Sequence, residues 1–202
     1  RSSTNLKEFT DEPNIDIRSC DIGIDSGAEF ADIGSPDMLL HLAWGGLPNY
    51  FSHHHFEVEL PAHYRFIRGL VQTGLKKLVC VGTCFEYGMK SGELSELDDT
   101  NPHTTYGLGK DTLRRQLQFL QRELPFELTW ARLFYMWGEG QAPSSLYQQV
   151  KKAIASKAEV FDMSKGDQTR DFLPVEVVAS YIADLCDIKK GVGIVNVCSG
   201  NP

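Results

Sequence analysis

The sequence lacks a long apolar run and has few basic residues. A helix that crosses a membrane needs about 18 consecutive apolar residues, and no such run occurs, so the sequence predicts no membrane span. The 20 lysines and arginines are outnumbered by 27 aspartates and glutamates, which gives a net charge of −7. Proteins that bind nucleic acids normally carry a basic face, so this charge argues against a nucleic-acid partner.

Cysteines are also few, odd in number and scattered, which argues against a disulfide framework. They lie mostly in apolar, strand-like runs and are better interpreted as buried, reduced thiols. No signal peptide is recognisable at the amino end. We therefore expect a cytoplasmic protein. The five cysteines are Cys20, Cys80, Cys84, Cys186 and Cys198.

The zinc-binding pattern His-Glu-x-x-His is absent from the sequence. Three adjacent histidines, His53, His54 and His55, stand close to Glu57. Consecutive side chains point in different directions, so three adjacent imidazoles cannot easily share one metal ion. We interpret this segment as a solvated loop before a helix and predict no metal site.

Strand and helix patterns alternate along the chain, which is typical of an α/β protein with a mainly parallel sheet. The 202 residues, 42% of them hydrophobic, suffice for one core, so we expect one domain. Strands are predicted at residues 15–22, 37–44, 77–83, 126–133, 158–161 and 192–197. Helices are predicted at residues 56–73, with a start near Leu60, and at 106–120, 146–155 and 175–185. Residues 88–105 form the longest predicted loop.

The most informative pattern is a tyrosine, Tyr106, followed by a lysine, Lys110, one helical turn later. A phenol normally titrates at about 10, and an adjacent ammonium lowers its pKa by roughly 1–3. We therefore expect Tyr106 to act as a general acid or base near neutral pH. Leu113, Leu117 and Leu120 continue the same helical face, so the pair is expected to point inward.

The predicted strand 77–83 ends in Thr83, and the helix that starts near Tyr106 is the next helix in the chain. Ligands of parallel sheets bind outside the carboxyl ends of the strands, so both residues are expected at the ligand-binding edge. We expect the Thr83 hydroxyl to bind a substrate oxygen, with a simple cap of the strand as the alternative.

Five motifs occur in the order and spacing found in extended short-chain dehydrogenases/reductases. They are GTCFEYG at residues 82–88, YGLGK at 106–110, RLFYMWG at 132–138, RDF at 170–172 and NVCSG at 196–200. The chain resembles this family, and more narrowly its nucleotide-sugar epimerase, dehydratase and 4-ketoreductase branch. The resemblance covers residue 15 to the end. It implies a Rossmann-like, doubly wound, mainly parallel sheet that binds NADP or NAD.

The chain departs from this family because the opening strand and the Gly-x-x-Gly-x-x-Gly turn, which approaches the cofactor pyrophosphate, do not occur in it. The family's C-terminal substrate lobe is missing as well. We therefore interpret the sequence as an internal portion of a longer protein. Residues 1–202 are expected to form a single Rossmann-like domain with part of the substrate-binding region, at about residues 135–175.

The resemblance also assigns cofactor contacts at the ends of predicted strands. The carboxylate of Asp21 and the backbone of Ile22 would meet the adenine ring, although Asp21 could instead cap the turn that follows. Leu42 and Ala43 would lie against the ribose and nicotinamide. Arg1 would follow the family's second strand and meet an adenosine 2′-phosphate, so NADP is expected to be preferred.

By the same resemblance, three residues would carry the chemistry. Tyr106 would exchange a proton with the sugar oxygen while the cofactor moves the hydride. Lys110 would hold the cofactor ribose and lower the pKa of Tyr106. Thr83 would orient the sugar oxygen.

Residues after Thr83 bear on the substrate and on the reaction type. Cys84 and Phe85 stand where the family's 4,6-dehydratases have two acidic residues, which argues against dehydration. By their position, both residues are also candidates for contact with the substrate. Cys84 is interpreted as a buried filler rather than a reactive thiol, because no basic residue is near it in the sequence. Glu86 and Tyr87 either pack and cap or contact ligand, and both alternatives stay open.

Two further candidates for substrate contact lie in the second half of the chain. Tyr135 follows the predicted strand 126–133 and would touch the sugar or nucleotide. Arg170 would clamp the substrate pyrophosphate with two parallel hydrogen bonds. Its alternative role is a surface ion pair with Asp171 or Glu176. Arg132 is interpreted as structural.

The function that we expect is that of an NAD(P)-dependent oxidoreductase of a nucleotide-activated sugar, and specifically a 4-ketoreductase of a dTDP-linked deoxyhexose. A nucleotide-sugar 4-epimerase is the alternative with the same chemistry. A module that binds cofactor or nucleotide sugar without catalysis is the alternative from another class, and its signature would be a broken Tyr/Lys/Thr set. The sequence leaves open whether the protein forms a homodimer.

Overall fold

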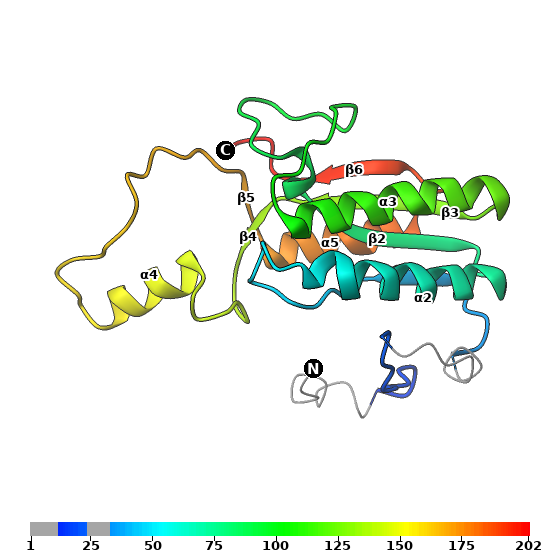
Figure 1. Ribbon diagram of the computed structural model, residues 1–202. Helices are drawn as coiled ribbons and strands as arrows, with labels where there is room; N and C mark the ends of the chain where they lie inside the picture. Colours follow the sequence, from blue (N-terminus) through cyan, green and yellow to red (C-terminus); the bar gives the residue numbers. More distant parts are fainter. Residues whose placement is uncertain (1–11, 24–32) are drawn as a thin grey trace.

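The computed structural model describes residues 12–23 and 33–202, and its centre is a parallel sheet of four strands (Figure 1). The strand order is β1-β2-β3-β6. The two central strands are buried along most of their length, which explains their continuous apolar sequences. The predicted strands at these four places are confirmed. The strands are β1 Met38–His41, β2 Lys77–Thr83, β3 Glu127–Leu133 and β6 Gly193–Val197.

Helices cover both faces of this sheet. Helices α2 (Leu60–Gln72) and α3 (Thr105–Glu123) pack on one face, and α5 (Val175–Asp187) packs on the other (Figure 1). Each face has its own apolar core, and Ile67, Leu113 and Trp130 belong to the larger one. The expected doubly wound α/β fold is therefore confirmed.

The helix boundaries follow local signals in the sequence. Pro61 lies in the first turn of α2, and Gly74, with φ of 107°, follows its end. A π-helical turn, His55–Glu59, precedes α2, so the predicted start near Leu60 is confirmed. The hydroxyl of Thr104 accepts a hydrogen bond from the Gly107 amide and caps α3.

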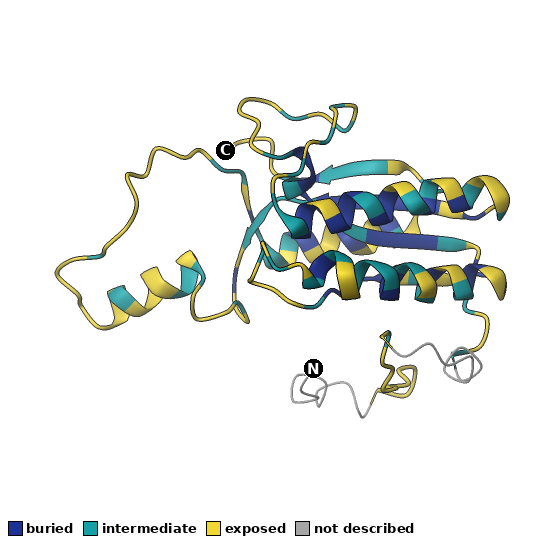
Figure 2. Ribbon diagram, in the orientation of Figure 1, coloured by how far each residue is buried: buried dark blue, intermediate teal, exposed yellow. Residues whose placement is uncertain are grey.

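A second, smaller sheet lies beyond the carboxyl ends of the main strands. It pairs β4 (Tyr135–Trp137) with β5 (Phe172–Pro174) in parallel. Helix α4 (Leu146–Ala155), predicted with these bounds, lies in the connection between them and projects away from the main sheet (Figure 1). None of its residues is buried (Figure 2). The two three-residue strands were not predicted.

Two predicted strands are wrong. Residues 15–22 are not a strand, and Ile15 and Ile17 are exposed. A strand requires a hydrogen-bonded neighbour, and among the described residues none runs beside this segment, because β1 is the edge of the sheet and pairs only with β2. Residues 158–161 also remain irregular, in the connection that follows α4, with Val160 exposed.

The predicted loop at residues 88–105 is confirmed as irregular chain between a 3₁₀ turn, Cys84–Tyr87, and α3. This loop is attached to the sheet by a hydrogen bond in which the backbone N–H of Asn196 donates to the Glu96 carboxylate at 2.8 Å. No helix in the described part of the chain is long and apolar enough to cross a membrane.

Candidate active site

The structure brings Thr83 and Tyr106 together at the carboxyl end of β2. Thr83 is the last residue of that strand, and Tyr106 lies in the first turn of α3. The Thr83 side chain is close enough to the Tyr106 phenol to lower its pKa, and both residues are buried. The loop after β1 fixes this end of α3, because the Tyr106 amide donates to the Tyr50 carbonyl at 3.1 Å. Two polar side chains therefore converge where a parallel sheet binds its ligands.

Lys110 lies one helical turn further along α3, where it is almost fully buried. Its Nζ donates to the Val81 carbonyl at 2.8 Å and lies 4.3 Å from the ring centroid of Trp44. Burial lowers the pKa of Lys110, while Cys80, Glu86 and Glu59 act in the opposite direction. The ammonium is therefore held between a carbonyl dipole and an aromatic face.

The expected lowering of the Tyr106 pKa is wrong for this structure. Burial raises the pKa of Tyr106, the Thr83 side chain opposes that rise, and Glu86 adds to it. The Lys110 ammonium, directed at the Val81 carbonyl and the Trp44 ring, is not among the main influences on this pKa. Tyr106 is consequently a protonated phenol, which can donate a proton to a substrate oxygen.

Aromatic rings surround the Tyr106 phenol. The rings of Tyr50 and Phe85 are stacked at 5.0 Å, and both meet Tyr106 edge-on, at 5.7 and 6.1 Å. Tyr135 continues this aromatic wall, 6.4 Å from Phe85. Sequence reasoning missed Tyr50, although its place in the loop after the strand 37–44 is a usable signal.

Cys84 lies beside this wall and is partly buried. Burial raises the pKa of its thiol to about 11, although the Arg170 guanidinium lowers it in part. The thiol is therefore protonated at neutral pH. The structure favours the interpretation of Cys84 as a filler rather than a nucleophile.

Tyr135 and Arg170, predicted as separate substrate contacts, meet at the second sheet. The Arg170 guanidinium lies 4.4 Å from the Tyr135 ring centroid and donates to the Tyr135 hydroxyl. Among the described residues, no ion pair joins Arg170 to Asp171 or Glu176. The Asp171 carboxylate instead accepts hydrogen bonds from the backbone amides of residues 199 and 200. Arg170 is thus held by its stack on Tyr135 rather than by a carboxylate.

In the described part of the chain, no hydrogen bond, ion pair or ring contact joins the other residues predicted to contact the cofactor to Thr83 or Tyr106. The Asp21 carboxylate accepts from the Gly23 amide at 2.9 Å and caps that turn, which is the simpler of its two predicted roles. Ile22, next to it, is partly buried. Leu42 directly follows β1 and is 58% exposed, and Ala43 beside it is partly buried. Arg1 lies outside the described residues.

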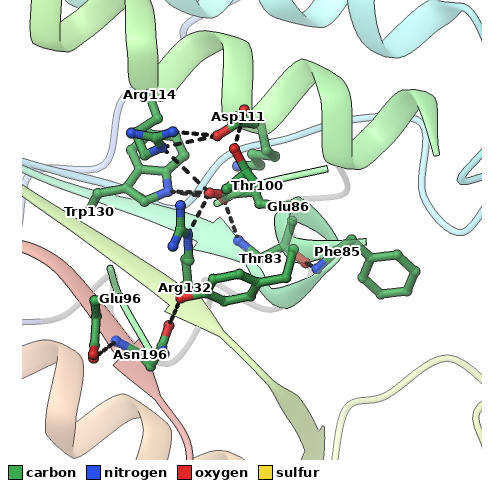
Figure 3. A network of polar contacts seen from close by, with 12 residues as sticks. Thr83, Phe85, Glu86, Glu96, Thr100, Asp111, Arg114, Trp130, Arg132 and Asn196 are labelled. Atoms are coloured by element: carbon green, nitrogen blue, oxygen red, sulfur yellow. Dashed lines mark hydrogen bonds and ion pairs between the residues drawn. The ribbon is translucent and has the colours of Figure 1, made fainter. Parts of the chain in front are cut away.

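A buried carboxylate, Glu86, organises the scaffold beneath the site (Figure 3). It accepts hydrogen bonds from the Thr83 amide at 2.9 Å, from Trp130 Nε1 at 2.9 Å and from Arg132 Nε at 2.8 Å. A Cβ at Gly82 would lie 2.2 Å from Trp130 Nε1 and 2.4 Å from Glu86 Oε1, so only glycine fits there. Glu86 therefore fixes the backbone of Thr83.

The same network extends to β6 (Figure 3). The Arg132 guanidinium lies 4.4 Å from the Tyr87 ring, and the Tyr87 hydroxyl donates to Asn196 Oδ1 at 2.7 Å. Burial raises the pKa of Glu86, and the adjacent Arg132 guanidinium is the main influence that opposes the rise. The structure thus gives Glu86 and Tyr87, both left open by the sequence, a scaffolding role, as it does Arg132.

The interpretation of the three adjacent histidines as a solvated loop holds for the exposed His53 but is wrong for His55. His55 is fully buried in the π-helical turn, where Trp44 Nε1 donates to its Nδ1 at 3.1 Å and its Nε2 faces the Asn49 carbonyl at 2.8 Å. His54 contacts the Glu59 carboxylate at 2.8 Å. In residues 12–23 and 33–202, no group of three or more His, Cys, Asp or Glu side chains is arranged to hold a metal ion.

Two curated proteins are similar to this chain in sequence. The chain is 29% identical over 171 residues to a dTDP-6-deoxy-L-talose 4-dehydrogenase (NAD(+)) of Aggregatibacter actinomycetemcomitans, and the alignment covers 84% of this chain and 63% of the relative. It is 24% identical over 156 residues to an uncharacterised UDP-glucose epimerase of Bacillus subtilis, and that alignment covers 73% of this chain and 46% of the relative. The chain thus spans about half to two thirds of the length of these relatives.

Solved structures share the fold. A UDP-glucuronic acid 4-epimerase of Bacillus cereus, in complex with UDP-glucuronic acid and NAD, superposes with a TM-score of 0.79 at 20% identity, over 98% of this chain and 64% of that one. MoeE5, in complex with UDP-glucose and NAD, superposes with a TM-score of 0.70 at 26% identity, over 82% and 57%. The sequence also matches a family model over residues 2–198, and the chain belongs to the NAD dependent epimerase/dehydratase family.

Proposed function

We propose that this protein is an NAD-dependent 4-ketoreductase, or 4-dehydrogenase in the reverse direction, of a dTDP-linked deoxyhexose. The observation that carries the proposal is the pair formed by Thr83 and the protonated phenol of Tyr106 at the carboxyl end of β2. A protonated phenol suits the reduction of a ketone, since the new hydroxyl requires a proton. The likeness to a dTDP-6-deoxy-L-talose 4-dehydrogenase supports the choice of substrate.

The described residues fit the nicotinamide end of a dinucleotide. Leu42 and Ala43 provide apolar surface at the carboxyl end of β1, and Lys110 and Tyr106 lie beside the adjoining Trp44. A flat ring with a hydroxylated sugar requires this combination of apolar surface and a few polar donors. When bound, the nicotinamide would supply or accept the hydride.

The chain's own residues would supply binding and proton transfer. Thr83 would orient the sugar oxygen, and Tyr106 would donate its proton to that oxygen in the reducing direction. Lys110 would contact the nicotinamide ribose. The wall formed by Tyr50 and Phe85 presents no carboxylate next to the substrate, which supports reduction over dehydration and suits the methyl group of a 6-deoxy sugar.

A 4-epimerase would use the same residues and return the hydride to the opposite face of the sugar. The likeness to epimerases supports this alternative. A reductase and an epimerase differ in whether the keto sugar rotates to present its other face before the hydride returns. A binding module without catalysis is disfavoured because Thr83 and Tyr106 lie together at the end of β2 and Lys110 is buried one helical turn away.

The proposal is tested by supplying a panel of nucleotide-linked 4-keto sugars with NADH or NADPH and following the oxidation of the cofactor. Net oxidation with a dTDP-4-keto-6-deoxyhexose supports the reductase. A parallel reaction supplies the 4-hydroxy nucleotide sugar with NAD, and interconversion of its 4-epimers without net reduction of the cofactor supports the epimerase. Binding of nucleotide sugar with neither reaction would leave the non-catalytic module.

Cofactor choice is a separate prediction. Arg1 gave the sequence-based expectation of NADP, whereas the similar dTDP-6-deoxy-L-talose 4-dehydrogenase is named as NAD(+)-dependent and MoeE5 was solved with NAD, and we propose NAD on that basis. Titration of both cofactors by calorimetry is expected to show tighter binding of NAD. Tighter binding of NADP would restore the role expected for Arg1.

The change Arg170→Lys is expected to weaken the binding of nucleotide sugar by about ten- to a hundredfold while cofactor affinity stays within a few fold. Lysine keeps the charge but loses the planar fork, and a charge-assisted hydrogen bond is worth roughly 1.5–3 kcal/mol. Calorimetry with the nucleotide sugar gives the dissociation constants.

The matched control is Arg122→Lys, since the Arg122 guanidinium also lies over an aromatic ring, 4.6 Å from the ring centroid of Phe119. Arg122 is in the last turn of α3, at the end of the helix opposite to Tyr106. It should leave both affinities unchanged. A sugar without the nucleotide diphosphate should bind Arg170→Lys and wild type equally. Unchanged nucleotide-sugar affinity in Arg170→Lys would place the pyrophosphate clamp elsewhere.

A further inference from the structure

A chain of buried side chains runs beneath β1 and is not used by the chemistry proposed above. Cys80 Sγ lies 3.6 Å from His41 Nδ1, His41 Nε2 lies 2.9 Å from His63 Nδ1, and His63 Nε2 lies 2.9 Å from Glu59 Oε2. We call these four residues the histidine chain. They come from β2, β1, α2 and the π-helical turn, and both histidines are only 3% exposed.

The carboxylate at the end of the histidine chain determines the direction of every hydrogen bond in it. An ionised carboxylate only accepts, so His63 Nε2 donates to Glu59. The other nitrogen of a neutral His63 ring then accepts, and it does so from His41 Nε2. His41 Nδ1 is left to accept from the Cys80 thiol. All three donors therefore point toward Glu59.

The ionisation of these groups agrees with this order. Burial lowers the pKa of both His41 and His63, so the two rings are neutral at neutral pH. Burial raises the pKa of the Cys80 thiol to about 12, so it remains a donor. Burial also acts to raise the pKa of Glu59, but hydrogen bonds from Gly45, His63 and His54 outweigh it and leave the pKa below its usual value.

Glu59 also fixes the loop that follows β1. Its Oε2 accepts from the Gly45 amide at 2.6 Å, and its Oε1 contacts His54 Nε2 at 2.8 Å. A Cβ at Gly45 would lie only 2.4 Å from Glu59 Oε1, so the close approach requires glycine. The carboxylate thus connects the loop, the π-helical turn and the histidine chain.

Trp44 connects this arrangement to the candidate active site. The His63 ring is stacked on the Trp44 ring, with centroids 4.8 Å apart and planes 10° from parallel. The Trp44 indole N–H is held by His55. Lys110 Nζ lies 4.3 Å from the Trp44 ring, and Tyr106 meets that ring edge-on at 6.2 Å. A change in the His63 ring therefore reaches the surface that supports Lys110.

We propose that Glu59 is a positioning residue for the reaction proposed above: its carboxylate orders the histidine chain and the Gly45 loop, which hold Trp44 against the Lys110 ammonium. Glu59 acts through Trp44, and its effect on turnover rests on the proposed function, in which Lys110 contacts the cofactor. Its effect on the histidine rings does not depend on that function.

The test compares Glu59→Ala with Glu57→Ala. Glu57 lies in the same π-helical turn, but it is exposed, and its carboxylate approaches the exposed His53, at 4.0 Å. Because a small displacement of a positioned group costs up to about a hundredfold in rate, Glu59→Ala is expected to lower kcat by about 10- to 100-fold with KM for the nucleotide sugar within about twofold. Glu57→Ala should match wild type in both constants.

A second readout needs no turnover. With ¹⁵N-labelled histidine, NMR should show His41 and His63 protonated at Nε2 in wild type. Alanine at position 59 removes the acceptor of the His63 Nε2 proton, so the two rings should no longer be held in one tautomer, and signals of the Nδ1-protonated forms should appear. The Lys110 signal in ¹³C-lysine spectra should move as well. Glu57→Ala should show none of these changes.

The outcomes separate the two proposals. Unchanged tautomers of His41 and His63 in Glu59→Ala would overturn the ordering role. Altered tautomers with an unmoved Lys110 signal and wild-type kcat would overturn the positioning role. A wild-type protein that turns over no nucleotide sugar would refute the proposed function, and the spectra would still decide the role of Glu59. If Glu59→Ala does not fold, Glu59→Asp shortens the carboxylate, and wild-type kcat and Lys110 signal in it would overturn positioning.

Discussion

Phenylalanine in place of Tyr106 is expected to lower turnover by about 10²–10⁴-fold while leaving cofactor affinity within a few fold. A positioned proton donor contributes about that factor to a rate, and the phenol lies beside the Thr83 side chain at the site. The ring itself remains, so its edge-on contacts with Tyr50 and Phe85 are kept. The measurement is steady-state kinetics with the best substrate of the keto-sugar panel.

The matched control is Tyr181→Phe, because Tyr181 is a partly exposed tyrosine on α5, on the opposite face of the sheet. It should leave turnover and cofactor binding unchanged. Activity of Tyr106→Phe within tenfold of wild type would show that another group supplies the proton.

Alanine in place of Glu86 is expected to destabilise the protein by about 3–5 kcal/mol, because it leaves the buried guanidinium of Arg132 without its carboxylate partner. Domains of this size are stable by about 5–15 kcal/mol, so the loss is a large part of the total. Urea unfolding followed by tryptophan fluorescence measures it. Glu93→Ala, at an exposed carboxylate in the nearby loop, should cost less than about 0.5 kcal/mol.

A double-mutant cycle isolates the buried pair. Glu86→Ala combined with Arg132→Met removes both charges, so the double variant should be less destabilised than the sum of the two single changes by about 1–3 kcal/mol. Strict additivity would mean that Glu86 and Arg132 do not stabilise each other. If Glu86→Ala does not fold, Glu86→Gln keeps the shape of the side chain and an acceptor, and it provides the first arm of the cycle.

The sequence predicted the elements whose patterns are long and whose partners lie in the same sheet. Strand Lys77–Thr83 and helix Leu146–Ala155 have their predicted bounds because an apolar β-branched run and a capped amphipathic stretch specify them locally. Residues 15–22 carry an equally good strand pattern, but pairing decides whether a strand forms, and pattern alone does not supply a neighbour. The strands Tyr135–Trp137 and Phe172–Pro174 are too short to show any period.

The candidate site was predictable in position but not in electrostatics. Spacing places Tyr106 and Lys110 on one helical face, and strand ends place Thr83 near them. The direction of the ammonium depends on the Val81 carbonyl and on the Trp44 ring, which reach Lys110 only through the fold. The burial of His55 is likewise a tertiary effect, because its partners are Trp44 and Asn49 in the preceding loop.

The second sheet, β4 paired with β5, has a consequence for the evolution of specificity. The proposed proton donor Tyr106 and its neighbours Thr83 and Lys110 lie on β2 and on α3, which packs on the main sheet. Tyr135 belongs to the smaller sheet, and Arg170 lies in the connection that carries α4. Residues that would grip the substrate can therefore be exchanged as one segment that lies outside the main sheet. A graft of residues 135–171 from a relative with another sugar would change what is bound and retain the chemistry.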